Sequence, residues 1–178
     1  MTARTLSCPV PENLNPLSPN GYMFSIEKLP SLSFFCQEVN LPSIILPEAQ
    51  QLNPFTKIPL AGDQLEYGTL TVQFLIDETM TNYRAIHHWL VSLGFPENYS
   101  QYTNFLDESK IPGLAEVAKS HSDGTLTILG NNNTQIQTVQ FKDLIPESLE
   151  SITFLSTNQD VQYLVGSVTF KYTYYKFL

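Results

Sequence analysis

The side chains best suited to chemistry are three histidines, of which His87 and His88 are adjacent in a segment with helical periodicity. Imidazoles bind transition metals, but adjacent helical residues point about 100° apart, whereas two ligands on one helix face need a spacing of three or four. His121 lies in an irregular region with no partner motif. The pattern therefore favours histidines at the surface or boundary of a helix over a metal site.

The carboxylates Asp77 and Glu78 are a second candidate for chemistry. They lie where a strand pattern gives way to a helix pattern, and negative charge at that place stabilises the positive end of the helix dipole. The sequence contains no Walker-type, GxSxG or GxGxxG motif, which are the common signatures of phosphate, acyl and dinucleotide chemistry. We therefore predict that the chain is not an enzyme and that it binds no cofactor.

Cys8 and Cys36 are the only cysteines, and neither belongs to a CxxC or Cys/His pattern. Two cysteines are too few for a disulfide framework, and their spacing does not fit a zinc site. Cys36 alternates with apolar neighbours, which indicates a small buried side chain. A bridge between Cys8 and Cys36 remains an open alternative.

The tyrosine-rich end, Tyr172 to Tyr175, has the composition of a platform on which nucleic-acid bases stack. Such platforms come with basic grooves, and here only Lys171 and Lys176 are near. The whole chain carries 9 Lys and Arg against 17 Asp and Glu, a formal net charge of −8. This balance argues against a protein that grips phosphate backbones, but it permits nucleic acid as a passing cargo, because like charge prevents sticking.

The length of 178 residues and the hydrophobic content of 42% fit one globular domain with its own core. The sequence shows no signal peptide pattern and no apolar run long enough to span a membrane. We therefore expect no membrane anchor, and folding in a cytoplasm. Residues 1–20, which include four prolines, are expected to form an extended arm that precedes a single domain over residues 21–178.

Periodicity in the first half of the domain predicts strands and one helix. Residues 22–27 and 32–39 are expected to form a hairpin around a turn at 29–31. Residues 65–76 alternate as a strand, with Leu70, Val72 and Phe74 on one face. Residues 81–93 have helical spacing, and the side chains expected to face the sheet are Tyr83, Ile86, Trp89, Leu90 and Leu93.

The C-terminal third is rich in β patterns. Strands are predicted at 125–129, 135–144, 152–155 and 161–177, with a turn at 130–133. The last strand is expected to be long and central, with a dry face formed by Val168, Phe170, Tyr172 and Tyr174. The sequence therefore predicts a mainly β fold, an antiparallel β-sandwich or small barrel with one flanking α-helix.

The connection 40–63 contains four prolines and is longer than ordinary connections, which is typical of functional loops. Pro54 and Pro59 remove two backbone donors, so this segment cannot be an interior sheet strand. Its apolar residues need a surface to cover them, either a neighbouring subunit or the core of the same chain. The interface predicted from this segment consists of Phe55, Thr56, Lys57, Ile58 and Pro59.

Taken in order, these patterns resemble the tail tube proteins of contractile-tailed bacteriophages. Residues 34–42 end in Leu-Pro like that family's second strand and its turn, and residues 57–63 end in Ala-Gly-Asp like its long loop. The strand 70–76, the acidic stop, the helix carrying Trp89 and the aromatic last strand follow in the same order. The resemblance covers residues 21–178.

The resemblance implies a structural protein of the virion tail, whose subunits form hexameric rings that stack into a tube. It implies self-association, contacts with sheath, baseplate or tail terminator proteins, DNA as passing cargo only, and assembly in the host cytoplasm. One alternative is a tube-initiating or tube-capping baseplate hub component of the same fold. A further alternative is a monomeric β-sandwich binding module whose exposed aromatics include Tyr99 and Tyr102.

Overall fold

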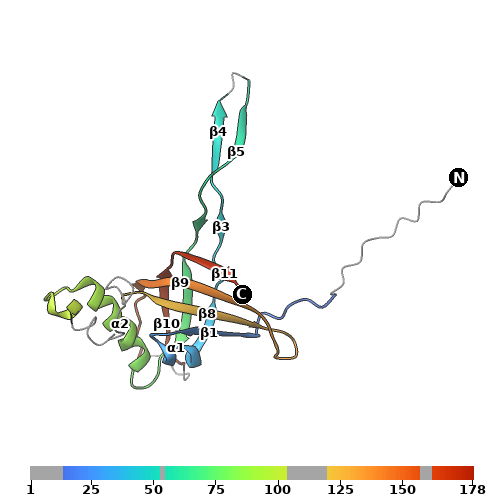
Figure 1. Ribbon diagram of the computed structural model, residues 1–178. Helices are drawn as coiled ribbons and strands as arrows, with labels where there is room; N and C mark the ends of the chain where they lie inside the picture. The colour runs from blue at the N-terminus through green and yellow to red at the C-terminus, as the bar shows by residue number, and fades with distance from the viewer. Residues whose placement is uncertain (1–13, 53–54, 104–119, 157–161) are drawn as a thin grey trace.

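The structure is a computed structural model that describes residues 14–52, 55–103, 120–156 and 162–178. Figure 1 shows a body of crossing strands with a helix on one side and a narrow ribbon that projects from it. The elements in chain order are β1 (Tyr22–Ile26), α1 (Pro30–Phe35), β2 (Cys36–Val39), β3 (Ile44–Ile45), β4 (Glu48–Leu52), β5 (Lys57–Ala61), β6 (Glu66–Tyr67), β7 (Leu70–Leu75), α2 (Thr81–Gly94), β8 (Ser122–Leu129), β9 (Gln135–Leu149), β10 (Val165–Lys171) and β11 (Tyr174–Phe177).

Seven strands form the sheet of the body in the order β1-β8-β9-β10-β7-β2, with β11 also paired to β9. All of these pairs are antiparallel. The long strand β9 belongs to both halves of the sheet, because its first part pairs with β8 and β11 and its last part pairs with β10. In Figure 1 the strands β1 and β8 cross β10 and β7 at a steep angle, so the sheet folds over itself. This confirms the predicted class, a mainly β antiparallel sandwich or barrel with a flanking helix.

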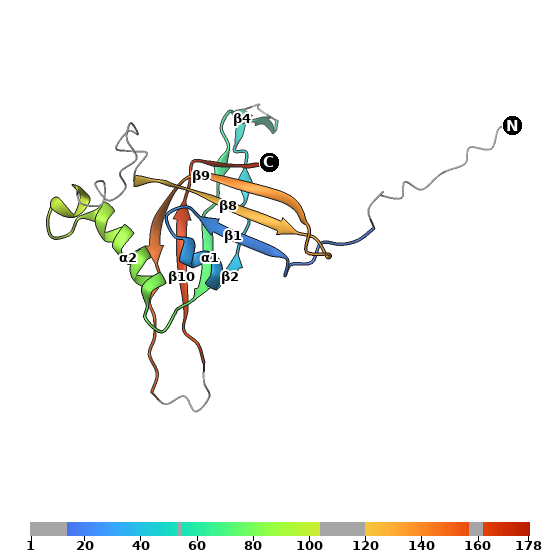
Figure 2. The same cartoon turned by 60° about the horizontal axis from the view of Figure 1, so that its bottom comes forward.

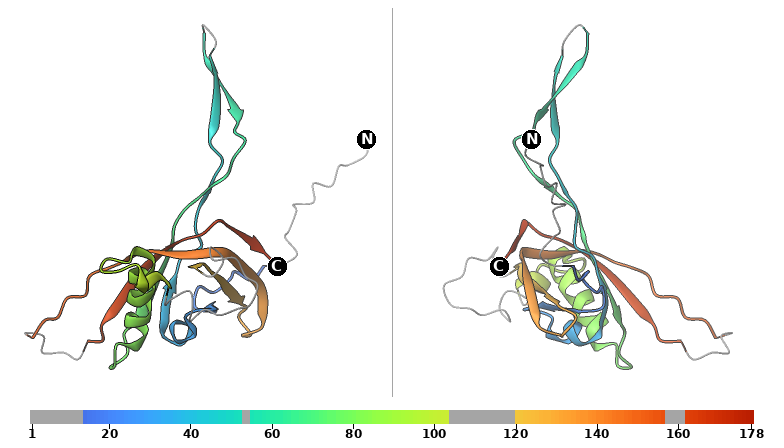
Figure 3. Two further views of the ribbon diagram at one scale, coloured as in Figure 1. Left: turned by 60° about the vertical axis from the view of Figure 1, so that its left-hand side comes forward. Right: turned by 90° about the vertical axis from the view of Figure 1, so that its right-hand side faces the viewer.

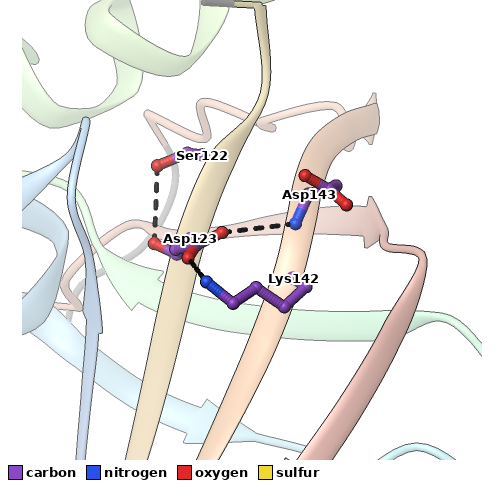
Figure 4. A network of polar contacts seen from close by, with 4 residues as sticks. All are labelled: Ser122, Asp123, Lys142 and Asp143. Carbon is purple, nitrogen blue, oxygen red and sulfur yellow. Dashed lines mark hydrogen bonds and ion pairs between the residues drawn. The ribbon is translucent and has the colours of Figure 1, made fainter. Parts of the chain in front are cut away.

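The bend of β9 is made by one extra residue, Asp143, which has a positive φ of 58°. Buried side chains fall at Val139 and Phe141 before it but at Leu144 after it, so the bulge shifts the inward face by one position. Asp123 on β8 holds the bulge, since its carboxylate forms an ion pair with Lys142 and accepts a 3.4 Å hydrogen bond from the Asp143 N–H (Figure 4). The bulge lets one strand serve both halves of the sheet.

The core lies between the two halves of the sheet and under α2. Alternation on β7 buries Leu70, Val72 and Phe74, as the sequence predicts. On the neighbouring strand β10, Gly166 lies opposite Phe74, and a Cβ there would come within 2.8 Å of the Phe74 ring. The fully buried side chains are Phe24, Phe74, Phe141, Phe170, Ile26, Leu32, Leu70, Ile86, Leu144, Val72, Val139 and Val168.

The predicted hairpin of residues 22–27 and 32–39 is wrong. β1 pairs with β8 and β2 pairs with β7, so the chain crosses from one end of the sheet to the other. The segment between them forms the short helix α1, with Pro30 in its first turn, where the missing N–H costs nothing. Cys36, at the start of β2, is only partly buried.

The C-terminal strand predictions need three corrections. Residues 152–155 form no strand, and β9 continues past residue 144 to Leu149. The predicted strand 161–177 is interrupted at Tyr172 and Thr173, although β10 and β11 run along the same side of β9. The bend shifts the alternation, so that Tyr175 packs against the core while Tyr174 is exposed.

Helix α2 confirms the prediction for residues 81–93. Ile86 and Trp89 are buried, and the remaining predicted inward side chains, Tyr83, Leu90 and Leu93, are partly buried against the core. The Trp89 indole N–H donates a 3.1 Å hydrogen bond to the Ser120 carbonyl. This bond ties the helix to the chain that leads into β8.

Lys28 offers a test of the packing around α2, because its ammonium lies 5.4 Å from the centroid of the Trp89 ring. Burial lowers the pKa of Lys28 to about 8 from its ordinary value of 10.5. Between pH 8 and 10.5 the unfolded chain keeps a proton that the folded chain has lost, so folding stability gains from this group as the pH rises. A shift of this size would contribute about 3 kcal/mol in a dry site, and because the side chain is only partly buried we expect about 1 kcal/mol.

The measurement is urea unfolding of the wild type and Lys28→Met at pH 7 and pH 10. The difference in free energy of unfolding, wild type minus variant, should rise with pH, and the other titrating groups cancel in that difference. A constant difference would contradict the prediction and would mean that the attraction of the indole ring for the ammonium offsets its desolvation.

Candidate functional site

The most prominent feature of the surface is the ribbon formed by residues 41–67, which we call the arm. It continues the β2–β7 pair outward, first as β3 paired with β6 and then as β4 paired with β5. The views in Figures 1 and 3 show the arm extending well beyond the body, with the β4–β5 end farthest away. A two-stranded ribbon buries little surface of its own and is at best marginally stable in water.

Proline and glycine shape the arm. The prediction that the region cannot be an interior strand agrees with the structure, because Pro59 lies in β5 of a two-stranded pair whose outer edge is open. The expectation of a loop is corrected, since strands occupy much of the region. Gly62 lies where the two segments of the arm approach closely, and a Cβ there would come within 2.0 Å of the Pro47 carbonyl oxygen. Only glycine permits this close approach.

Apolar side chains are exposed along the whole arm. Phe55, beside the far end, is 94% exposed. The other exposed apolar side chains of the arm are Leu41, Ile44, Ile45, Leu46, Leu60 and Leu65. Apolar side chains gathered on one projecting element are typical of a surface that another protein covers.

Polar contacts fix the base of the arm to the body. The Asn40 side chain bridges β7, donating to the Thr69 carbonyl at 3.1 Å and accepting from the Thr71 N–H at 2.6 Å. The Tyr175 hydroxyl donates a 3.2 Å hydrogen bond to the Pro42 carbonyl. These contacts set the direction in which the arm leaves the sheet.

An aromatic cluster supports the same base. Tyr67 on β6 packs edge-on against Tyr172 and Tyr175, with ring centroids 5.9 and 5.6 Å apart. Burial raises the pKa of Tyr172, and the neighbouring Tyr175 and Tyr67 add to the effect. The tyrosine-rich end, considered above as a base-stacking platform, therefore packs against the arm and the core.

The predicted interface residues lie together next to the far end of the arm. Phe55 and Thr56 precede β5, while Lys57, Ile58 and Pro59 belong to it. The side chains of Phe55, Thr56, Lys57 and Pro59 are exposed. The structure therefore places them where a second molecule can reach them, and their role as a subunit interface stays a prediction.

The groups considered for catalysis or metal binding are dispersed. His87 and His88 are exposed on α2. Asp77 accepts a 2.6 Å hydrogen bond from the Thr79 hydroxyl and a 3.3 Å bond from the Asn82 N–H near the start of α2, and the Thr79 bond in particular lowers its pKa. Across residues 14–52, 55–103, 120–156 and 162–178 no group of three or more His, Cys, Asp or Glu could hold a metal ion.

Two further observations bear on the sequence predictions. No helix in the described part of the chain is both long enough and apolar enough to cross a membrane. The N-terminal arm prediction, residues 1–20, falls mostly outside the described residues, as does Cys8 and with it the question of a Cys8–Cys36 bridge.

Sequence reasoning missed the apolar base of the arm and the contacts that hold it. The run Ile44-Ile45-Leu46 between two prolines could have indicated it, because three adjacent apolar residues in a proline-rich connection need a covering surface. The hydrogen bond between Tyr175 and Pro42 joins residues 133 positions apart, and no local pattern predicts it.

Comparison with known proteins gives matches of structure only. No family model matches the sequence, and no curated protein matches it. A chain in the six-fold symmetrised baseplate of the anti-feeding prophage is similar, with a TM-score of 0.62 at 12% identity over 92% of this chain and 96% of that chain.

Two other solved structures extend the similarity. A chain in the tube-terminating cap of the anti-feeding prophage has a TM-score of 0.62 at 12% identity over 99% of both chains. A chain in the extended sheath–tube complex of the PVC extracellular contractile injection system has a TM-score of 0.55 at 14% identity, over 92% of this chain and 91% of that chain. At such identities the similarity concerns the fold, and over nearly its whole length the chain has the tail tube-like fold of contractile injection systems.

Proposed function

We propose that the chain is a structural, non-catalytic subunit of a contractile tail, and that its copies assemble into hexameric rings that stack into a tube. The observation that carries the proposal is the arm, whose exposed apolar residues have no core of their own to cover them. A tail tube-like fold supports it, because the similar chains come from baseplate, cap and sheath–tube structures. The tube would belong to a bacteriophage virion and would be assembled in the host cytoplasm.

The acidic composition gives such a tube a physical advantage. A lumen lined by a protein with a net charge of −8 would repel DNA and ease its passage. DNA would then be a passing cargo, and the lasting partners would be further copies and the sheath, baseplate or terminator proteins of the tail.

A tube-end or baseplate hub component is the second candidate. The matches with the higher TM-score of 0.62 come from a baseplate and from a tube-terminating cap, against 0.55 for the sheath–tube complex. Such a component would form a ring through the same fold but would not polymerise by itself into long tubes.

The experiment is electron microscopy of the concentrated protein, with light scattering over a dilution series. Long tubes would support the tube subunit, single or paired rings the end component, and a monomer at all concentrations would contradict both. A monomer would instead favour a binding module, for which the cluster of Phe95, Tyr99 and Tyr102 is the candidate surface, with Phe95 and Tyr99 exposed.

We predict that the variant Phe55→Asp, Leu60→Asp folds but does not assemble. Full burial of an apolar side chain contributes about 1.5–3 kcal/mol, and each 1.4 kcal/mol changes an association constant about tenfold. Loss of the two contacts should therefore raise the concentration needed for assembly by about 100-fold or more. Phe55→Leu is the matched control and should assemble, and normal rings from the double variant would show that the arm is not an interface.

A further inference from the structure

A groove opens at the end of the body opposite the arm. It has a volume of about 410 Å³ and lies between β1 and the α1–β2 segment, with Tyr22, Met23, Pro30, Phe34 and Cys36 among its lining residues. Phe34 is 85% exposed and Met23 is 58% exposed, so these apolar side chains of the lining are open to solvent.

The groove exists because the folded sheet does not close. β1 and β2 are the two ends of the strand order, and they do not pair with each other in the described chain. The side chains of Tyr22 and Cys36, one from each end, lie close enough to affect each other's ionisation. The short helix α1 lies between β1 and β2 and presents Phe34 outward.

The arm of the same molecule cannot fill the groove. In Figures 1 and 3 the β4–β5 end and α1 lie at opposite ends of the molecule, and Figure 2, which brings the α1 end forward, shows β4 behind the body. A surface at one end that matches a surface at the other produces a head-to-tail contact, which repeats from one copy to the next. An occupant from a second copy therefore suits this geometry.

The two ends also match in chemistry. Phe55 offers an exposed aromatic ring, and a groove of about 410 Å³ whose lining includes Met23, Pro30 and Phe34 can take such a ring together with part of its neighbours. Lys57 is exposed two residues after Phe55, while Glu38 is exposed on β2 beside the groove. Burial raises the pKa of the Tyr22 hydroxyl, and Glu38 is close enough to add to the effect. One end of the molecule therefore carries an aromatic ring and a cation. The other end carries the groove and a carboxylate, which are complementary to them.

We propose that Phe55 of one copy docks in the groove between β1 and α1 of a second copy, with Lys57 placed against Glu38. The contact rests on the proposed self-assembly and adds to it the acceptor surface and the direction of the interaction. Burial of Phe55 and Phe34 against each other provides the affinity, and the charge pair favours one register.

Cysteine cross-linking tests the contact directly, because Cys36 already lies in the groove. In a Cys8→Ser background, Phe55→Cys should give a ladder of disulfide-linked multimers on oxidation. Burial raises the pKa of Cys36 to about 11, so a copper–phenanthroline oxidant at pH 9 is the suitable reagent. Thr81→Cys, on the exposed face of α2, is the matched control and should give no ladder with Cys36.

Adding Cys36→Ser to Phe55→Cys should reduce the ladder to dimers at most. If the ladder persists without Cys36, or if no ladder forms from assembled protein, the groove is not the acceptor. A ladder that requires both cysteines supports the contact.

A charge exchange provides an independent test that keeps both apolar partners. Lys57→Glu and Glu38→Lys should each weaken assembly severalfold in light scattering, and the double variant should recover most of the loss. A double variant no better than either single change overturns the pairing.

The two proposals fail in different ways. Rings or tubes from the wild type, together with no cross-link to Cys36 in the assembled Phe55→Cys variant, would contradict this docking contact and leave the proposed function intact. A wild-type protein that stays monomeric would overturn both, and a groove found occupied by a different tail protein would overturn the contact alone.

Discussion

A fragment that ends at Gly166 is expected not to fold. β10 lies between β7 and β9, so removing it leaves both neighbours with an unpaired edge in the middle of the sheet. The fragment also loses Val168 and Phe170, both fully buried. Their loss alone costs several kcal/mol, which is comparable to the whole stability of a typical domain, about 5–15 kcal/mol.

Circular dichroism with urea unfolding measures the outcome, and a fragment 1–173 is the control. The control keeps β10 and loses β11, which pairs only with β9 in the described chain. It should unfold cooperatively at lower urea concentration, while the shorter fragment shows no cooperative transition. Cooperative unfolding of the fragment 1–166 would mean that β10 is an appendage to a core that is complete without it.

Replacing Trp89 by alanine is expected to destabilise the fold by about 3–5 kcal/mol. The side chain is 2% exposed, lies 6.2 Å from Phe170 between ring centroids, and donates its N–H to the Ser120 carbonyl. The change therefore removes a large apolar volume and leaves a buried carbonyl without its donor.

Urea unfolding followed by circular dichroism measures this loss, with Trp89→Phe as the control. Phenylalanine keeps most of the volume but not the donor, so its cost should be clearly smaller than that of alanine. Trp89 is the only tryptophan, so its emission in the native wild type should be shifted to shorter wavelength than in urea. Native emission typical of water would contradict the buried position.

The sequence predicted the parts of the fold that depend on local periodicity. The alternation of Leu70, Val72 and Phe74 and the helical spacing of Ile86 and Trp89 correspond directly to buried faces. These patterns are reliable where one face of an element packs on the core, because a shift of one residue would expose every large side chain.

The failures occurred where distant contacts decide the structure. Residues 32–35 are apolar enough for a strand, but Pro30 begins a helix there and the two strands on either side pair with β8 and β7. Tyr174 and Tyr175 are adjacent and chemically identical, so local sequence does not show which of them is buried. The bend after Lys171 places Tyr175 against the core. The bulge at Asp143 depends on Asp123, which lies twenty residues earlier.

The candidate site could be predicted in its composition but not in its form. Two prolines and Phe55 indicated a segment that needs an outside surface, and the structure places Phe55 and Pro59 on a projecting ribbon. The direction of the arm follows from Asn40, Tyr67 and Tyr175, which meet only in the folded chain. The groove is a product of topology, since it lies between the two ends of the sheet.

The pairing of β1 with β8, in which Tyr22 lies opposite Ile128, has a consequence for synthesis on the ribosome. β1 has no sheet partner until residues 122–129 have been made, and the sheet is incomplete until β10 has followed. Residues of the arm leave the ribosome about 100 residues before β10, a delay on the order of 5–20 s at 5–20 residues/s. The groove depends on β1 being held in place, so a nascent chain would carry the arm without a finished acceptor. With the proposed docking contact, neighbouring chains on one messenger RNA would thereby be kept from polymerising before they are released.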